Sequence, residues 1–179
     1  MHLMPLTDQP CARLVIAATW RPNMGLEEVI EKLSSQFGAV LRWGDVYDFS
    51  ALYSPYYENE MGMGLLKCFI EFSGIRDRST LLTAKLSALA FEQENQVSGK
   101  RVINVDPMLV SLENVLISTT KNAPQRVFIG QGIFADLALI RKDGAYRPFE
   151  WTYRDYVDHC GFFEESNKGL KKELRERAS

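Results

Sequence analysis

Along the first 106 residues, short apolar runs alternate with segments in which apolar residues recur at helical spacing. The first pattern predicts strands and the second predicts helices. Residues 12–20 form a nearly continuous run of short and β-branched apolar residues that stops at the turn-forming sequence Arg-Pro-Asn. Such a run predicts a buried strand. In residues 25–38 the apolar side chains instead recur at helical spacing, and Gly38 stands at the expected C-cap. This second segment is therefore predicted to be a helix with one apolar stripe.

The same patterns continue along the chain and predict a fold class. Two strands are expected at 39–50 and 65–74, a second helix at 78–99 and a strand at 101–106. This order predicts an α+β fold with a ferredoxin-like βαββαβ core, in which both helices lie on one face of an antiparallel sheet. Further C-terminal strands that extend or flank the sheet are expected at 114–120, 126–130, 133–141 and 146–151, with a hairpin turn at Lys-Asp-Gly.

The length and composition fit one domain spanning residues 1–179. The chain has 46% hydrophobic and 25% charged residues, enough to bury a core without metal or disulfide staples. Residues 1–11 are interpreted as an N-terminal extension. Residues 166–179 form a highly charged C-terminal tail, for which a solvated, fraying helix is predicted.

Charge and cysteine usage narrow the functional classes. A net charge of -2 and a pI near 5.8 argue against a broad nucleic-acid or anionic-membrane surface, which would need clustered Lys and Arg. The three cysteines are far apart without CxxC spacing, and the N-terminal apolar run is too short to span a membrane. The segment before that run also lacks the basic region of a signal peptide. A cytoplasmic protein without nucleic-acid or membrane partners is expected.

The second predicted helix has charged residues at positions where a helical-wheel projection predicts burial. At about 100° per residue, Lys85 and Glu92 fall near the middle of the apolar arc. A charge in that layer needs a partner, and the two lie too far apart along the axis to satisfy each other. Strand alternation places Asn104 and Asp106 together on the face opposite Ile103, so Asp106 is the expected partner of Lys85.

Polar and aromatic residues also gather at predicted strand ends. The connection at 54–62, Ser-Pro-Tyr-Tyr-Glu-Asn-Glu-Met-Gly, is richer in acids and tyrosines than a plain hairpin requires. We predict that at least one of Glu58 and Glu60 faces a concave pocket containing Asp106, Lys121 or Arg126. The segment around Tyr153 is rich in aromatic residues, which predicts either a flap of core aromatics or a pocket wall.

These positions support a hypothesis of a small-molecule site, as an enzyme or a binding protein for a phosphate- or carboxylate-bearing ligand. Glu60, Asp106 and Lys85 are the candidate catalytic residues, and a divalent cation such as Mg²⁺ is a candidate cofactor held by carboxylates. The candidate ligand-binding residues are Tyr56, Tyr57, Glu58, Glu92, Lys121, Asn122, Arg126 and Tyr153. The alternative is a non-catalytic interaction module whose buried polar network only fixes the fold. RNA binding is disfavoured because the RNP1 aromatic pattern is absent.

Three partial motifs carry little weight. Residues 130–135 satisfy the letters GxGxxA, but the following segment is predicted as strand rather than as the helix that a dinucleotide site needs. Thr-Lys-Asn-Ala at 120–123 lacks the aspartate of the guanine-reading element of GTPases, and the chain has no phosphate loop. His159 and Cys160 are adjacent and point in different directions on a regular element. A buried Cys beside a surface His is the favoured interpretation.

Several longer stretches together resemble one family of prokaryotic proteins. The stretches, in order, are YDFSALYSPYYENEMG, the helix bearing Lys85 and Glu92, KRVINVDP, ISTTKNAPQR, GIFADLALI and EWTYRDY. Over residues 12–165 they resemble the uncharacterised family known as domain of unknown function 4416. The resemblance implies a single-domain bacterial or archaeal protein with no established activity, whose relatives have sometimes been labelled GTP-binding. The chain departs from the family pattern at Met108, where Gly is preferred, and at Gln125, where His commonly precedes the Arg.

Overall fold

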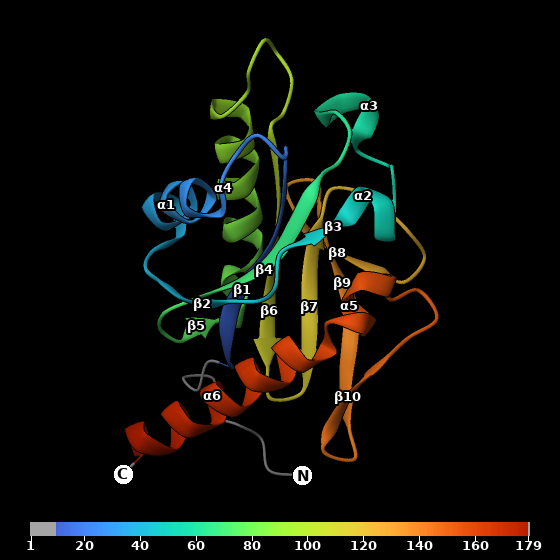
Figure 1. The fold of residues 1–179 in the computed structure, drawn as a ribbon. Helices are drawn as coiled ribbons and strands as arrows, with labels where there is room; N and C mark the ends of the chain where they lie inside the picture. Colours follow the sequence, from blue (N-terminus) through green and yellow to red (C-terminus); the bar gives the residue numbers. More distant parts are fainter. Residues whose placement is uncertain (1–9, 179) are drawn as a thin grey trace.

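The computed structural model describes residues 10–178, and it shows a mixed α+β protein (Figure 1). The N-terminal half contains β1 (Cys11–Trp20), α1 (Leu26–Phe37), β2 (Val40–Trp43), β3 (Tyr47–Asp48), α2 (Phe49–Leu52), α3 (Glu58–Met61), β4 (Leu66–Phe72), β5 (Arg76–Asp77), the 3-10 turn η1 (Arg78–Thr80) and α4 (Leu81–Glu94). The remainder contains β6 (Ile103–Ser111), β7 (Asn114–Thr119), β8 (Arg126–Gly130), β9 (Ile133–Lys142), β10 (Ala145–Pro148), α5 (Arg154–Asp158) and α6 (Cys160–Ala178).

The strands form one open antiparallel sheet with the order β10-β9-β7-β6-β1-β4-β2. Strand β1 lies inside it and pairs with β6 over nine residues, from Ala12 opposite Ser111 to Trp20 opposite Ile103. On its other edge β1 pairs with β4. The continuous apolar run of β1 follows from this position, because a strand covered on both faces has no solvent side.

Helices cover both faces of the sheet (Figure 1). Helices α1 and α4 pack on one face against Ile16, Ile70 and Val105, so the predicted placement of the two helices on one face is confirmed. The opposite face carries Phe69 and other aromatic side chains that pack against α2, α5 and α6. Side-chain alternation along β1 supplies both layers, because successive residues point to opposite faces.

Two segments differ from the sequence-based expectation. The strand predicted at 39–50 is interrupted after β2, resumes only briefly as β3 and is followed by the one-turn helices α2 and α3. Asp48 caps α2 by accepting a hydrogen bond from the Ala51 N–H. The charged C-terminal segment is helical, as predicted, and belongs to α6; its first residues pack on the sheet, whereas residues 171–177 are mainly exposed. Ser166, Asn167 and Leu170 are buried there. Residues 1–9 of the expected N-terminal extension lie outside the described residues.

Both glycine-containing turns of the C-terminal half are hairpins. Gly130, Gln131 and Gly132 have positive φ angles between β8 and β9, so the GxGxxA letters mark a turn and not a helix start. Asp143 and Gly144 also have positive φ, at 53° and 79°, and they connect β9 to β10. Two successive positive φ values are the requirement of the expected tight hairpin turn.

Candidate functional site

The site begins where strands β6 and β7 separate. Their pairing covers Met108–Val110 and Val115–Ile117, and beyond Ile117 strand β7 continues along β9 alone. Pro107 lies at the point of separation and has no N–H to donate. The Ser118 hydroxyl donates to the Pro107 carbonyl at 2.8 Å and closes the gap at its base. Above this contact the sheet opens into a pocket of about 400 Å³.

The pocket is lined by five basic and five acidic side chains. The basic residues are Lys67, Lys85, Arg101, Lys121 and Arg126, and the acidic residues are Glu60, Glu92, Asp106, Asp136 and Asp155. They come from α3, α4, α5, four strands and two loops. Charges gathered in a partly desolvated space need partners, and most of these residues have one.

The side chains of α4 replace the missing strand along the open edge of β6. Lys85 donates to the Val105 carbonyl at 3.0 Å and to Asp106 Oδ1 at 2.9 Å. Glu92 Oε1 accepts from the Val105 N–H at 2.6 Å. Lys85 and Glu92 are 4% and 3% exposed, so their expected burial and the Lys85–Asp106 contact are confirmed. They satisfy the backbone groups that β7 leaves free.

Arg101 joins this edge to helix α3. Its Nε and NH2 groups form two 2.6 Å bonds with the Glu60 carboxylate, and NH1 donates to Glu92 and Asn104, each at 2.9 Å. The hydrogen bonds from Arg101 lower the pKa of Glu60, while Glu60 raises the pKa of Arg101. Burial raises the pKa of Glu92 above its usual value, against the opposing effect of Lys85.

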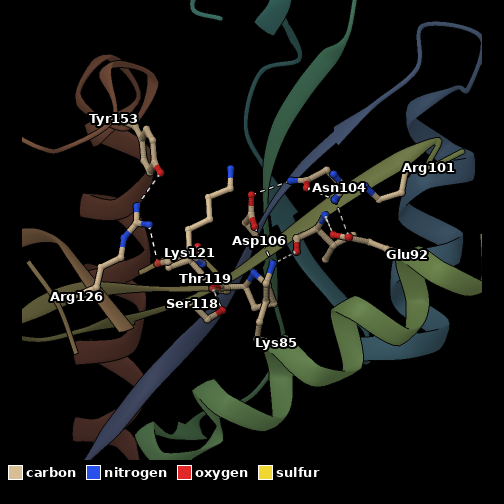
Figure 2. Close-up of polar contacts among 12 residues, drawn as sticks. Lys85, Glu92, Arg101, Asn104, Asp106, Ser118, Thr119, Lys121, Arg126 and Tyr153 are labelled. Atoms are coloured by element: carbon tan, nitrogen blue, oxygen red, sulfur yellow. Dashed lines mark hydrogen bonds and ion pairs between the residues drawn. The ribbon is translucent and has the colours of Figure 1, made fainter. Parts of the chain in front are cut away.

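Asp106 stands at the centre of this network (Figure 2). Oδ1 accepts from Lys85, and Oδ2 accepts from the Asn104 amide at 2.8 Å. Burial opposes ionisation of Asp106, but Lys85, Lys67 and the Asn104 bond outweigh it and lower the pKa. The Asp106 side chain is 25% exposed, so part of it faces the pocket.

The other side of the pocket is built on β8, β9 and the segment before α5. Arg126 donates through Nε to Asp136 at 2.8 Å, through NH1 to the Lys121 carbonyl at 2.8 Å and through NH2 to the Tyr153 hydroxyl at 3.2 Å. In Figure 2 the Lys121 side chain lies between the Arg126–Tyr153 pair and Asp106. Lys121 Nζ donates to the Tyr56 hydroxyl at 2.8 Å and lies 4.0 Å from the centre of that ring.

A third pair lies at the aromatic end of the pocket. Lys67 Nζ donates to Asp155 Oδ2 at 2.6 Å, and the same oxygen accepts from the Tyr47 hydroxyl at 3.1 Å. The ammonium also lies 4.7 Å from the Phe49 ring and 5.1 Å from the Tyr156 ring. Both members of the ion pair are almost fully buried.

Most of the residues proposed from the sequence do line this pocket. They are Tyr56, Tyr57, Glu60, Lys85, Glu92, Asp106, Lys121, Arg126 and Tyr153. The prediction that the 54–62 connection brings a glutamate to a pocket with Asp106 is therefore confirmed for Glu60. Glu58 does not line the pocket and instead accepts from the Gly64 N–H at 3.5 Å, within its own loop. Asn122 is exposed outside the lining, because the chain turns away after Lys121.

Four charged pocket residues were not predicted from the sequence, namely Arg101, Lys67, Asp136 and Asp155. Lys67 and Asp136 are charged residues within apolar strand segments. Because a buried charge needs a partner, this pattern could have marked both as site residues. Arg101 stands in a loop with ordinary surface composition, so no local pattern marks it. Across residues 10–178, no group of three or more His, Cys, Asp or Glu side chains is placed to hold a metal ion. The carboxylates considered as candidate Mg²⁺ ligands are therefore not gathered into such a group within these residues.

The fold and the site define a mixed α+β protein with a charged pocket at the opening between two sheet strands. Residues 10–167 match the family model described as Domain of unknown function (DUF4416), and the chain belongs to that family. No curated protein and no solved structure matches the chain significantly. Among the described residues, no helix has both the length and the apolar character needed to cross a membrane.

Proposed function

We propose that this protein binds a small anionic ligand, bearing a phosphate or carboxylate group, at the mouth of the pocket. The observation that carries the proposal is the environment of Lys121. The other four basic side chains of the lining each pair with a carboxylate. The Lys121 ammonium contacts Tyr56 and Tyr57, and within residues 10–178 it forms no ion pair with a carboxylate. Its positive charge is available to a ligand.

The groups around Lys121 suit such a ligand. The tyrosines at the mouth, Tyr56 and Tyr153, are 62% and 50% exposed, and each presents an apolar ring with a polar tip. Arg126 adds a second cation, 9% exposed, that its partners hold in place. Exposed aromatic rings beside a fixed cation are typical of sites that hold the organic part of a charged ligand.

We assign the Lys85 half of the pocket a supporting role. Glu60 and Asp106 have lowered pKa values, so at neutral pH they are weak bases, whereas a general base works best with a pKa near the working pH. Lys85 is held by two acceptors. This division favours ligand binding over acid–base catalysis by these three residues. It combines the ligand hypothesis for one half with the structural-network hypothesis for the other.

We also propose a ferredoxin-like core and a cytoplasmic location for this protein. The order β6-β1-β4-β2, with α1 and α4 as crossovers on one face, supports a ferredoxin-like βαββαβ core to which β7–β10 are added. The acidic balance of the chain supports a protein without nucleic-acid or membrane partners, and the cysteine spacing supports a cytoplasmic location.

The binding proposal is tested by thermal shift with inorganic phosphate, sugar phosphates, nucleotides and sugar acids, each with and without Mg²⁺. A ligand at a hundred times its Kd adds about 2.7 kcal/mol of stability. We expect Lys121→Met to weaken binding at least about tenfold, because it removes the unneutralised cation. Lys142→Met, at an exposed position on β9 outside the lining, is the matched control and retains binding. Equal binding by both variants contradicts the proposal.

A further inference from the structure

Within residues 10–178, one buried carboxylate oxygen of a pocket residue has no hydrogen-bond partner. Asp136 is 4% exposed and lines the pocket from β9. Its Oδ2 accepts from Arg126 Nε, whereas Oδ1 is buried and accepts no hydrogen bond from residues 10–178. A buried, ionised acceptor without a donor is rare, and an unsatisfied group of this kind calls for an explanation.

The geometry of Arg126 explains why Oδ1 is left over. A guanidinium can satisfy both oxygens of a carboxylate through two parallel N–H bonds. Here Nε is the group that donates to Asp136, while NH2 donates to the Tyr153 hydroxyl and NH1 donates to the Lys121 carbonyl. The N–H groups of the guanidinium therefore donate both to residues at the mouth of the pocket and to Asp136 in its interior.

Neighbouring donors in the lining are already engaged. Lys67 donates to Asp155, Lys85 donates to Asp106, and the Ser118 hydroxyl donates to the Pro107 carbonyl. Each of these contacts satisfies a group that would otherwise be buried without a partner. These three donors are therefore not available to Asp136 Oδ1, and a molecule that enters the pocket can supply the missing donor.

We propose that Asp136 Oδ1 is the subsite for a hydroxyl group of the ligand, which makes the ligand a hydroxylated anion such as a polyol phosphate, a sugar phosphate or a sugar acid. The inference rests on the proposed anion site at Lys121 and names the second group that this ligand carries. Both residues line the same pocket, and one guanidinium contacts both Asp136 and the Lys121 backbone carbonyl. A single small molecule can occupy both subsites.

A neutral donor fits this position better than an ammonium group. Arg126 already neutralises Asp136 at 2.8 Å. A second buried cation beside Asp136 would be uncompensated and therefore unfavourable. A hydroxyl supplies the missing hydrogen bond without adding charge.

The test uses matched probes that differ only in hydroxyl groups. Glycerol 3-phosphate is compared with propyl phosphate, and gluconate with hexanoate, by isothermal titration calorimetry. The wild type should bind the hydroxylated member of at least one pair at least about tenfold more tightly, because a site built to bond a hydroxyl discriminates strongly against an analogue that lacks it. In Asp136→Asn that preference should fall, since the ligand hydroxyl loses a charge-assisted bond to a carboxylate and meets a neutral amide N–H instead.

Two controls separate the possible outcomes. Asp143→Asn makes the same charge change in the exposed turn between β9 and β10 and should keep the preference, and thermal unfolding checks that each variant is folded. If both members of each pair bind wild type equally, a water satisfies Oδ1, and the hydroxyl subsite is wrong while the anion site stands. A preference unchanged in Asp136→Asn also overturns it. If none of the four probes binds, the proposed anion site fails, and the hydroxyl subsite fails with it.

Discussion

Two residues of α4 are the part of the site whose burial could be predicted from the sequence alone. Lys85 and Glu92 interrupt an apolar helical arc, and that pattern is local enough to predict burial and a need for partners. The partners were harder to predict, because folding brings them from far along the chain. Arg101 meets Glu60 across 41 residues and Lys67 meets Asp155 across 88, and no local spacing encodes such contacts.

Replacing Lys85 by Met tests its supporting role. The change leaves Asp106 without its nearest cation and the Val105 carbonyl without its donor. We expect a loss near the lower end of about 3 to 5 kcal/mol in the free energy of unfolding, because Asp106 keeps partial solvent access. Urea denaturation measures this. The double variant with Asp106→Asn should recover part of the loss, and no recovery would mean that the pair is not coupled.

Glu92 should give the protein a distinctive pH dependence. Its pKa in the folded state is raised above the usual 4.5 by burial, so the folded state binds this proton more tightly than the unfolded state does. Between the raised pKa and 4.5 the contribution of Glu92 to the free energy of unfolding therefore increases as the pH falls. Comparing wild type with Glu92→Gln by urea denaturation across this window isolates that contribution. A difference between the two that does not change with pH contradicts the burial argument.

The opposite sign is expected for Glu60 and Asp106. Their folded-state pKa values lie below the usual 4.5 and 3.8, so the stability they contribute is present above those values. It is lost as the pH falls through the lowered pKa values. Below about pH 4 the wild type should therefore lose stability more steeply than Asp106→Asn does. Parallel curves for the two proteins in the same urea series would count against this assignment.

Among the secondary structure elements, the long periodic segments were predictable and the short ones were not. Strand β1 is long enough to show a continuous apolar run, and helix α1 is long enough to show a helical period. Helices α2 and α3 have four residues each, which is too short for helical periodicity to appear. In α6 the abundant charges of the last turns concealed the buried positions, among them Leu170.

The packing of α6 predicts a sharp contrast between two of its residues. Leu170 is fully buried, whereas Lys172 is exposed on the same helix. Leu170→Ala should lower the free energy of unfolding by about 2 to 5 kcal/mol, through lost burial and the cavity left behind. Lys172→Ala should change it by no more than about 0.5 kcal/mol, as surface substitutions usually do. Similar losses for both would indicate that α6 does not pack on the sheet.

Helix α3 should depend on the Glu60–Arg101 pair for its position. Glu60→Gln weakens the pair but leaves Arg101 with Glu92, so we expect global stability to change by no more than about 1 kcal/mol. Amide exchange at Met61 and Gly62, which donate within α3, should become faster. Glu31→Gln, at an exposed position of α1, is the control and should leave these amides unchanged. Unchanged exchange in Glu60→Gln would show that the pair does not hold α3.

At the scale of the whole molecule, the pocket results from a single feature of the sheet. Strands β6 and β7 pair over three residues and then separate, and side chains of α4 satisfy the freed edge of β6. The sequence indicated which polar residues approach the strand ends. It did not indicate the separation itself, since strand pairing depends on register across the sheet rather than on the pattern within one strand.

The central claim is that an anionic ligand occupies the mouth of this pocket, and a titration followed by two-dimensional amide NMR tests it most directly. With glycerol 3-phosphate as the probe, we expect saturable shifts concentrated at Thr119, Thr120, Lys121, Arg126 and Asp136, and in Lys121→Met the same shifts should need at least about tenfold more ligand. Saturable binding would separate a formed site from general ion effects, which depend on ionic strength. Shifts spread over the exposed lysines and arginines of α6, with the pocket amides unmoved, would contradict the account.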